Sequence, residues 1–183
     1  MAYNNIDENF DRISQPDGIN IPLMEHQKSC ICAMKHIEDA GKVTARDIEF
    51  YGNKMNFDVE TSIGILADSV GSGKSLMVIS LIESSKIAPV RNMYWAGSQF
   101  VAIKSTTNSI SKNINLVIVP HNLMTQWINF FKHAPKLKLG TYKDIEDEKM
   151  FLNEETLGDI DVMLLSCTRS KSFFSKFSEI KWN

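Results

Sequence analysis

The chain has 183 residues, a length that favours one domain with a buried core. Its composition, 43% hydrophobic and 23% charged, excludes a disordered chain. The net charge of −2 excludes a global basic field that would draw the whole chain to nucleic acid or to an anionic membrane, so any nucleic-acid contact must come from a local patch. The three cysteines (Cys30, Cys32 and Cys167) are too few for a disulfide framework and favour an intracellular, reducing compartment. No apolar run of about 18 residues is present, so no membrane span is expected.

The N-terminal third contains an expected lead-in, a helix and a connector. Residues 1–20 are polar and contain a Pro-Asp-Gly turn at 16–18, so this stretch is expected to be a flexible lead-in. Apolar residues at helical spacing predict a helix over about 24–40. Residues 41–61 are expected to be a polar connector, and a short helix after residue 44 is left open.

A glycine loop follows, between an expected buried strand at 63–67 and an expected helix at 76–85. Strand, glycine loop and helix in this order are typical of a phosphate cradle, because glycines let backbone N–H groups turn toward a polyphosphate and the helix N-terminus adds unpaired donors. Lys74, the catalytic candidate, is expected to reach the β- and γ-phosphates, and the Ser75 hydroxyl is expected to bind Mg²⁺. The expected phosphate-binding residues are Val70, Gly71, Ser72, Gly73, Lys74, Ser75 and Leu76.

The strict phosphate-loop pattern G-x-x-x-x-G-K-[ST] is only half present. It requires glycine at position 68, where the sequence has Asp68. The alternative interpretation is a glycine turn ahead of an ordinary amphipathic helix. The apolar stretches on both sides of the loop favour the phosphate cradle, because the motif needs a strand before it and a helix after it.

The second half of the chain alternates strands with helices. Expected strands are 115–120, 137–142 and 161–166, expected helices are 121–132, 145–157 and 170–177, and residues 93–104 are expected to form a hairpin or strand. This alternation predicts an α/β fold, a parallel sheet with helices on both faces, in which 115–120 is a central strand. Ligands bind such sheets at the carboxyl ends of the strands. The Ser69–Ser75 loop, the Pro120 turn and the turn at 166–168 are therefore expected to share one edge.

Four segments carry motifs of a known family. Within Ile65–Ser75, residues 66–75 match Leu-Ala-Asp-x-x-Gly-x-Gly-Lys-Thr except at the last position, where Ser75 stands for threonine, and Val119–Trp127 contains Pro-x-x-Leu-x-x-Gln-Trp. Leu23–Gln27 is a Leu-x-x-x-Gln segment, and 161–168 is a strand that ends in a Ser/Thr turn. Over residues 21–183, the chain resembles the first RecA-like domain of superfamily 2 helicases and translocases, on the Swi/Snf-like branch. That family carries aspartate where Asp68 stands, and a large-DNA-virus member would suit the sequence.

The resemblance implies ATP and Mg²⁺ as cofactors, with duplex DNA favoured over RNA as the track. It implies that Gln27 binds adenine, although a polar residue at a helix start is the alternative for Gln27. Trp127 is expected in the core rather than as a base-stacking platform. The resemblance also implies localisation in the nucleus, or in a viral factory or virion for a viral member. The residues implied to lie near the phosphate backbone of one strand are Pro120, His121, Asn122, Gln126, Ser166 and Thr168.

Hydrolysis requires an acidic pair at the end of a hydrophobic strand, and no strand expected here ends in one. The family places this Asp-Glu (Walker B) strand soon after a segment like the last residues of the chain. We therefore expect 21–183 to be a first RecA-like domain that is truncated before that strand, without the second RecA-like domain and its arginine finger. Such a fragment should be inactive, whereas its parent should hydrolyse ATP. The alternative function is a stand-alone nucleotide-binding or scaffold domain without motor activity.

Overall fold

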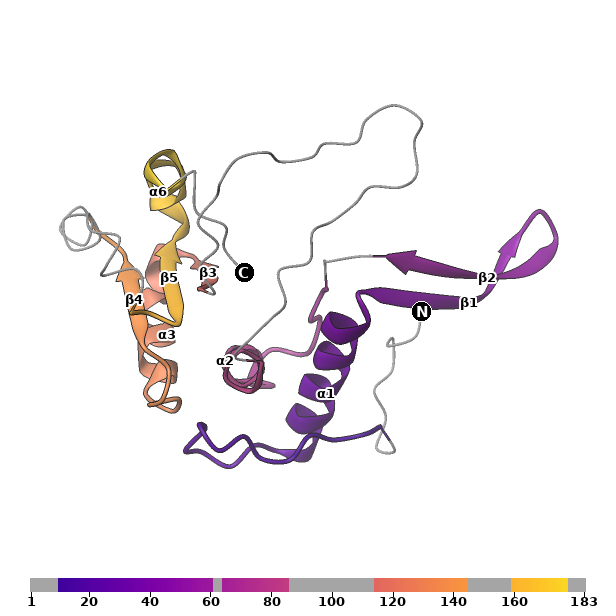
Figure 1. The fold of residues 1–183 in the computed structure, drawn as a ribbon, viewed down its shortest axis with the longest axis horizontal. Coiled ribbons are helices and arrows are strands. Elements are labelled where there is room, and N and C mark those ends of the chain that lie inside the picture. Colours follow the sequence, from indigo (N-terminus) through magenta and orange to yellow (C-terminus); the bar gives the residue numbers. More distant parts are fainter. Residues whose placement is uncertain (1–9, 61–63, 86–113, 145–158, 178–183) are drawn as a thin grey trace. The chain divides into compact units, whose positions relative to one another are not determined.

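The computed structural model describes residues 10–60, 64–85, 114–144 and 159–177 (Figure 1). The chain divides into two compact units. The N-terminal unit comprises Met1–Ser85 and Asn129–Lys136, and the C-terminal unit comprises Lys86–Ile128 and Leu137–Asn183. Each unit is described by itself below. The elements expected at 93–104 and 145–157 lie outside the described residues.

Residues 10–24, called the strap below, pack on the rest of the N-terminal unit, so the prediction of a flexible lead-in over 1–20 is wrong for residues 10–20. The expected turn at 16–18 is present, because the Ile19 N–H donates to the Pro16 carbonyl at 3.1 Å. Pro16 and Ile19 are buried. The polar composition misled the prediction, since hydrogen bonds of the strap to its neighbours, rather than apolar residues alone, hold it in place.

Helix α1 (Glu25–Ala40) begins and ends close to the predicted positions. It ends at Gly41, which has a left-handed φ of 63° and whose N–H donates to the Ile37 carbonyl at 2.9 Å. Helix α1 packs on helix α2 (Lys74–Ser84). Ile31 of α1 and Met77 of α2 are fully buried, and each buried side chain of this size contributes roughly 1.5–3 kcal/mol. This packing holds the start of α2, and with it the glycine loop, on α1.

Strands β1 (Lys42–Phe50) and β2 (Asn53–Glu60) form an antiparallel hairpin, so the prediction of a polar connector over 41–61 is wrong. Both residues of its turn have positive φ, 50° at Tyr51 and 75° at Gly52, as the type I′ turn of a two-residue hairpin requires. Tyr-Gly is a weak turn signal compared with Asn-Gly or Asp-Gly. The alternation of Met55, Phe57 and Val59 with polar residues was a strand signal that the prediction overlooked.

Residues 64–69 form no strand, so the predicted buried strand at 63–67 is wrong for residues 64–67. Ile65 in this segment is 88% exposed. A parallel strand needs a neighbour that offers backbone hydrogen bonds, and among the described residues no strand pairs with this segment. The apolar composition was therefore not sufficient to form a strand.

The C-terminal unit contains a parallel sheet of three strands, β3 (Asn115–Val119), β4 (Leu139–Tyr142) and β5 (Val162–Ser166). Their order among the described strands is β3-β5-β4. All three strands were predicted, but among the described strands β5 is the central one and not β3, as the prediction had it. Every residue of β5 is buried, whereas Ile118 of β3 is 47% exposed. The β-branched run of β3 resembles an interior strand and does not reveal the strand order.

Helices cover both faces of this sheet. Alternate residues of a strand point to opposite faces, and Leu164 of β5 packs with Met124 of helix α3 (Met124–Phe131). Its neighbours Met163 and Leu165 pack instead with Phe173 of helix α6 (Ser170–Lys176). The predicted α/β fold, a parallel sheet with helices on both faces, is therefore confirmed. None of the helices within the described residues has the length and apolar character needed to cross a membrane.

Candidate functional site

The glycine loop, residues 68–74, turns sharply into helix α2. Gly71 and Gly73 have φ values of 88° and 87°, in the left-handed region that favours glycine. The Met77 N–H donates to the Gly73 carbonyl at 3.0 Å, and it is the first amide of α2 with an acceptor in its own helix. The three preceding amides, of residues 74–76, therefore have no acceptor within the helix. Amides in this position are suited to bind an anion.

Lys74 folds back across the loop from which it projects. Its Nζ donates to the Asp68 carbonyl at 2.9 Å and to the Ser69 carbonyl at 2.6 Å. The Asp68 side chain also closes the loop, because its Oδ1 accepts the Ser69 N–H at 2.7 Å. This backbone bond, followed by the Ser72 hydroxyl, lowers the pKa of the Asp68 carboxyl below its ordinary value. Asp68 thus has a structural role at the position where the strict motif has glycine.

Gln27 connects the start of helix α1 to the glycine loop. Its Oε1 accepts the Met24 N–H at 2.9 Å, which ties the first turn of α1, and its Nε2 donates to the Ser72 carbonyl at 3.0 Å. The side chain is buried. A Cβ on Gly73 would overlap Gln27 Nε2, so the close approach depends on glycine at this position. Gln27 thus caps the helix, as the alternative interpretation expects, and also contacts the loop, whereas its binding of adenine stays a prediction.

The other expected loop residues differ in what they can offer a phosphate. Gly71 and Val70 are open to solvent, and no atom lies within 4 Å of where a Gly71 Cβ would stand. The Leu76 side chain is buried, so only its amide is available. Ser75 is half-buried, and its hydroxyl has no hydrogen bond to another described residue. The loop therefore has an open face, unpaired amides, a lysine amine and a hydroxyl, which together fit a triphosphate with Mg²⁺.

A hydroxyl and imidazole cluster lies at the carboxyl ends of β3 and β5 in the C-terminal unit. The register pairs Val119 with Ser166, so the residues that follow both strands meet. His121 Nδ1 lies 3.3 Å from Ser166 Oγ, and Ser166 Oγ lies 2.9 Å from Thr168 Oγ1. Ser166 is buried, whereas His121 and Thr168 are exposed. The structure thus brings together three of the six residues predicted to contact nucleic acid.

The remaining three predicted residues lie at the start of α3. Pro120 precedes the 3₁₀ turn His121–Leu123, and Pro120, Asn122 and Gln126 are all exposed. Trp127 is half-buried and packs against the apolar cluster of Val119, Met124 and Leu164, as expected for a core residue. Of the six residues predicted to contact nucleic acid, the three at the start of this segment are therefore exposed but are not part of the hydroxyl cluster.

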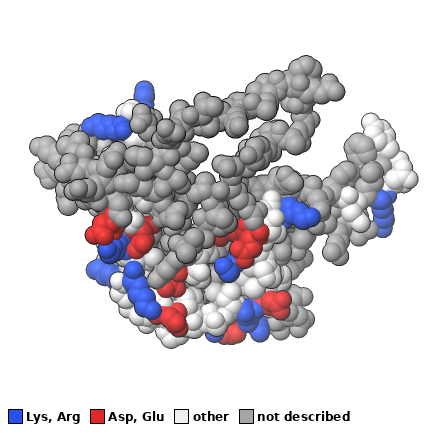
Figure 2. Space-filling view, in the orientation of Figure 1, with Lys and Arg blue, Asp and Glu red and all other residues white. Residues whose placement is uncertain are grey.

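The structure also assigns contacts to residues that the sequence did not single out. His26 Nε2 lies 3.2 Å from the Ser72 carbonyl, next to Gln27. Its position one residue before Gln27 was the only available signal. On the face drawn in Figure 2, basic and acidic side chains of the described residues are interspersed, as expected from the small net charge. The glycine loop and the hydroxyl cluster belong to different units, so their sharing one sheet edge stays a prediction.

Comparison with known proteins identifies relatives of this chain. The chain is 29% identical over 171 residues to a candidate helicase of Acanthamoeba polyphaga mimivirus, a match that covers 84% of this chain and 20% of the relative. It is 30% identical to the nuclear protein STH1/NPS1 of Saccharomyces cerevisiae, over 70% of this chain and 8% of the relative. It is 36% identical to the DNA repair protein rad5 of Aspergillus fumigatus, over 35% of this chain and 5% of the relative. The chain thus spans about a fifth or less of the length of the curated relatives it matches.

A solved structure shares the fold. The Sulfolobus solfataricus SWI2/SNF2 ATPase core in complex with dsDNA superimposes with a TM-score of 0.51 at 18% identity, covering 85% of this chain and 24% of that chain. The family profile of the SNF2-related domain matches residues 26–183, which include Gln27, the glycine loop and the hydroxyl cluster. The chain therefore belongs to the SNF2-related domain family.

Proposed function

We propose that this chain is the ATP-binding part of a DNA-dependent ATPase that translocates along duplex DNA or unwinds it. The observation that carries the proposal is the glycine loop, with Gln27 bound to one of its carbonyls and Lys74 folded across it. The Gln27 amide, proposed to bind adenine, and the Lys74 amine, proposed to bind phosphate, are thus both hydrogen-bonded to the same loop.

In this proposal ATP lies with its phosphates against the amides of residues 70–76. Lys74 exchanges its two loop carbonyls for the β- and γ-phosphates, which offer it a full negative charge in place of two dipoles. The Ser75 hydroxyl would hold Mg²⁺, and the metal would supply positive charge to neutralise charge on the phosphates. Gln27 binds the adenine base, at the opposite end of the nucleotide from the γ-phosphate.

Duplex DNA is the proposed partner of the C-terminal unit. The hydroxyls of Ser166 and Thr168, the His121 imidazole and the exposed residues Pro120, Asn122 and Gln126 present small polar groups rather than a dense basic field. Such groups hold phosphates in register without reading the sequence. The archaeal SWI2/SNF2 ATPase core that shares the fold is in complex with dsDNA, which supports DNA over RNA as the partner.

Hydrolysis by the whole protein needs groups that none of the described residues supplies. We propose that an Asp-Glu strand and a second RecA-like domain complete the catalytic centre, and that residues 21–183 alone bind nucleotide weakly and do not turn it over. The viral and nuclear relatives favour action in the nucleus, or in a viral factory or virion.

The ATPase rate of the full-length protein, measured by phosphate release with and without duplex DNA, tests the proposal. DNA should stimulate the rate, RNA of equal length should stimulate it less, and Lys74→Ala should lower the stimulated rate by about 100-fold or more. Lys136→Ala, which removes an exposed lysine outside the glycine loop and the hydroxyl cluster, is the control and should leave the rate unchanged. Stimulation that survives Lys74→Ala would refute the motor function. ATP binding without any DNA-stimulated turnover would support the stand-alone alternative.

Cysteine footprinting tests the DNA contact separately. Cys167 lies between Ser166 and Thr168 and is exposed, whereas Cys32 is buried in α1. Saturating duplex DNA should slow alkylation of Cys167 and leave the alkylation rate of Cys32 unchanged. An unchanged rate at Cys167 under saturating DNA would contradict placement of the DNA at this edge.

A further inference from the structure

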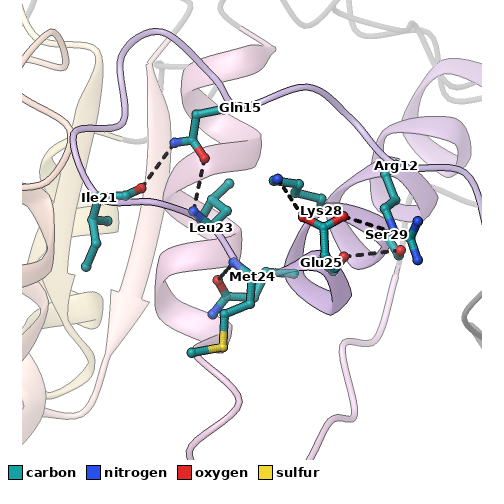
Figure 3. A network of polar contacts seen from close by, with 9 residues as sticks. Arg12, Gln15, Ile21, Leu23, Met24, Glu25, Lys28 and Ser29 are labelled. Atoms are coloured by element: carbon teal, nitrogen blue, oxygen red, sulfur yellow. Dashed lines mark hydrogen bonds and ion pairs between the residues drawn. The ribbon is translucent and has the colours of Figure 1, made fainter.

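Gln15 of the strap has its amide nitrogen and oxygen bound to one turn of backbone (Figure 3). Its Nε2 donates to the Ile19 carbonyl at 3.2 Å. The same nitrogen donates to the Ile21 carbonyl at 3.1 Å, and Oε1 accepts the Leu23 N–H at 3.0 Å, as Figure 3 shows. One side chain thus closes residues 19–23 into a compact turn. Few other residue types could reproduce this arrangement, because it uses two donors and one acceptor of a primary amide at fixed reach.

The turn that Gln15 closes leads directly into Gln27. Leu23, which donates to Gln15, immediately precedes Met24, and the Met24 N–H is bound by Gln27 Oε1 at 2.9 Å. Gln15 and Gln27 therefore bind consecutive backbone N–H groups. The bond to Met24 also fixes which way the Gln27 amide faces, because only its oxygen can accept an N–H.

The strap is anchored to α1 on the N-terminal side of Gln15. The Arg12 Nε lies 3.4 Å from a carboxylate oxygen of Glu25, the first residue of α1, and the Ile13 N–H donates to the Lys28 carbonyl at 3.5 Å. Lys28 Nζ binds the other Glu25 oxygen at 2.7 Å (Figure 3). The pKa of Glu25 is lowered chiefly by this Lys28 hydrogen bond, so the carboxylate is charged at neutral pH.

A second anchor lies on the C-terminal side of Gln15. The Asn20 backbone N–H donates to the His133 carbonyl at 2.9 Å, and its side-chain Oδ1 lies 3.1 Å from His133 Nδ1. At Gly18, a Cβ would overlap the carboxylate of Glu83 in the last turn of α2. The strap is thus held at both ends, and Gln15 sets the shape of the chain between them.

We propose that Gln15 is a positioning residue that holds Gln27 for recognition of adenine. The inference rests on the proposed nucleotide binding. With one lone pair of Oε1 on Met24 and one hydrogen of Nε2 on Ser72, Gln27 keeps one acceptor site and one donor for a base. Adenine presents the complementary pair, an N6 amino donor beside the N7 acceptor, whereas guanine presents two acceptors, O6 and N7. Gln15 therefore governs the preference for adenine over guanine, and it acts on the phosphate loop only through the single bond of Gln27 to the Ser72 carbonyl.

Binding to the full-length protein, measured by isothermal titration calorimetry with ATP, GTP and inorganic tripolyphosphate, tests this inference. Gln15→Ala should weaken ATP binding by about fivefold to tenfold, since the lost hydrogen bonds loosen the turn that holds Gln27. GTP and tripolyphosphate should change less than about twofold, because their affinity depends on the loop. Ser14→Ala, an exposed neighbour in the strap, is the matched control and should bind all three ligands as the unmodified protein does.

Gln15→Glu serves as the second variant, and carries the test if circular dichroism shows that Gln15→Ala is unfolded. A carboxylate still accepts the Leu23 N–H but cannot donate to the carbonyls of Ile19 and Ile21, so it should reduce the ratio of ATP to GTP affinity. Equal losses for ATP and tripolyphosphate, or an unchanged ratio of ATP to GTP affinity in both variants, would overturn the positioning role. If Lys74→Ala leaves tripolyphosphate binding intact, the proposed function is refuted, and the inference about Gln15, which rests on it, is refuted as well.

Discussion

Replacing Gly73 by alanine should destabilise the glycine loop more than the same replacement at Gly71. The two residues have nearly equal φ values, 87° and 88°, so the backbone strain of a left-handed alanine, about 1–2 kcal/mol, is common to both. Only at Gly73 would the new Cβ overlap Gln27 Nε2. Gln27 must then release the Ser72 carbonyl, a loss of about 0.5–1.5 kcal/mol. The expected totals are about 1–2 kcal/mol for Gly71→Ala and about 2–3 kcal/mol for Gly73→Ala.

Hydrogen–deuterium exchange, followed by mass spectrometry on peptides that cover residues 64–84, measures the free energy of local opening. The expected difference of about 1 kcal/mol between the two variants corresponds to about fivefold in the opening equilibrium. Peptides from β5 serve as an internal control, and their exchange should be unchanged.

A double-mutant cycle isolates the steric term. In a Gln27→Ala background the amide is absent, so Gly73→Ala should destabilise the loop only as much as Gly71→Ala does. The coupling energy between Gly73 and Gln27 should therefore be about 1 kcal/mol, and that between Gly71 and Gln27 close to zero. Equal effects of the two glycine substitutions, or additive behaviour of Gly73 with Gln27, would refute the contact between helix α1 and the loop.

Three further predictions concern the core, the cysteines and acid sensitivity. Leu164→Ala removes a fully buried side chain from β5 and should lower the free energy of unfolding in urea by about 2–5 kcal/mol; a loss below about 1 kcal/mol would contradict its burial. Iodoacetamide should alkylate the exposed Cys167 before Cys30, because burial, and then the charge of Asp68, raise the pKa of the Cys30 thiol. The lowered pKa of Asp68 means that its stabilisation of the loop is present above its ordinary pKa of 3.8 and is lost as the pH falls through the lowered value. Hydrogen exchange of the loop should show this loss below pH 3.8, and Asp68→Asn should remove it.

Local patterns were sufficient where the structure depends on neighbours along the chain. Helix α1 ends at a glycine, the loop needs glycines at positions with positive φ, and the apolar run of β5 is long enough to be buried on both faces. The candidate residues of the loop were therefore identifiable from their order, whereas Gln27 was named only through the resemblance of Leu23–Gln27 to a segment of the family. Such features are set by residue types and short-range geometry.

Other features depended on contacts that no local pattern contains. The segment 64–67 is as apolar as β5 but forms no strand, because a strand also requires partners that accept and donate its backbone hydrogen bonds. The polar strap packs because Gln15 and Asn20 satisfy backbone groups over distances that the sequence does not reveal. The meeting of His121 with Ser166 follows from the register of two strands that are far apart in the sequence.

The sequence by itself determined the α/β class, most of the helix and strand positions, and which residues form the turn of the glycine loop. Tertiary structure alone decided that β5 rather than β3 lies in the middle of the sheet, that residues 42–60 form a hairpin, and that Gln27 bonds to the loop carbonyl of Ser72. The physical reason is that helices and glycine turns are stabilised by bonds between residues close in the chain. Strand order and side-chain bridges depend instead on which distant groups are brought within hydrogen-bonding distance.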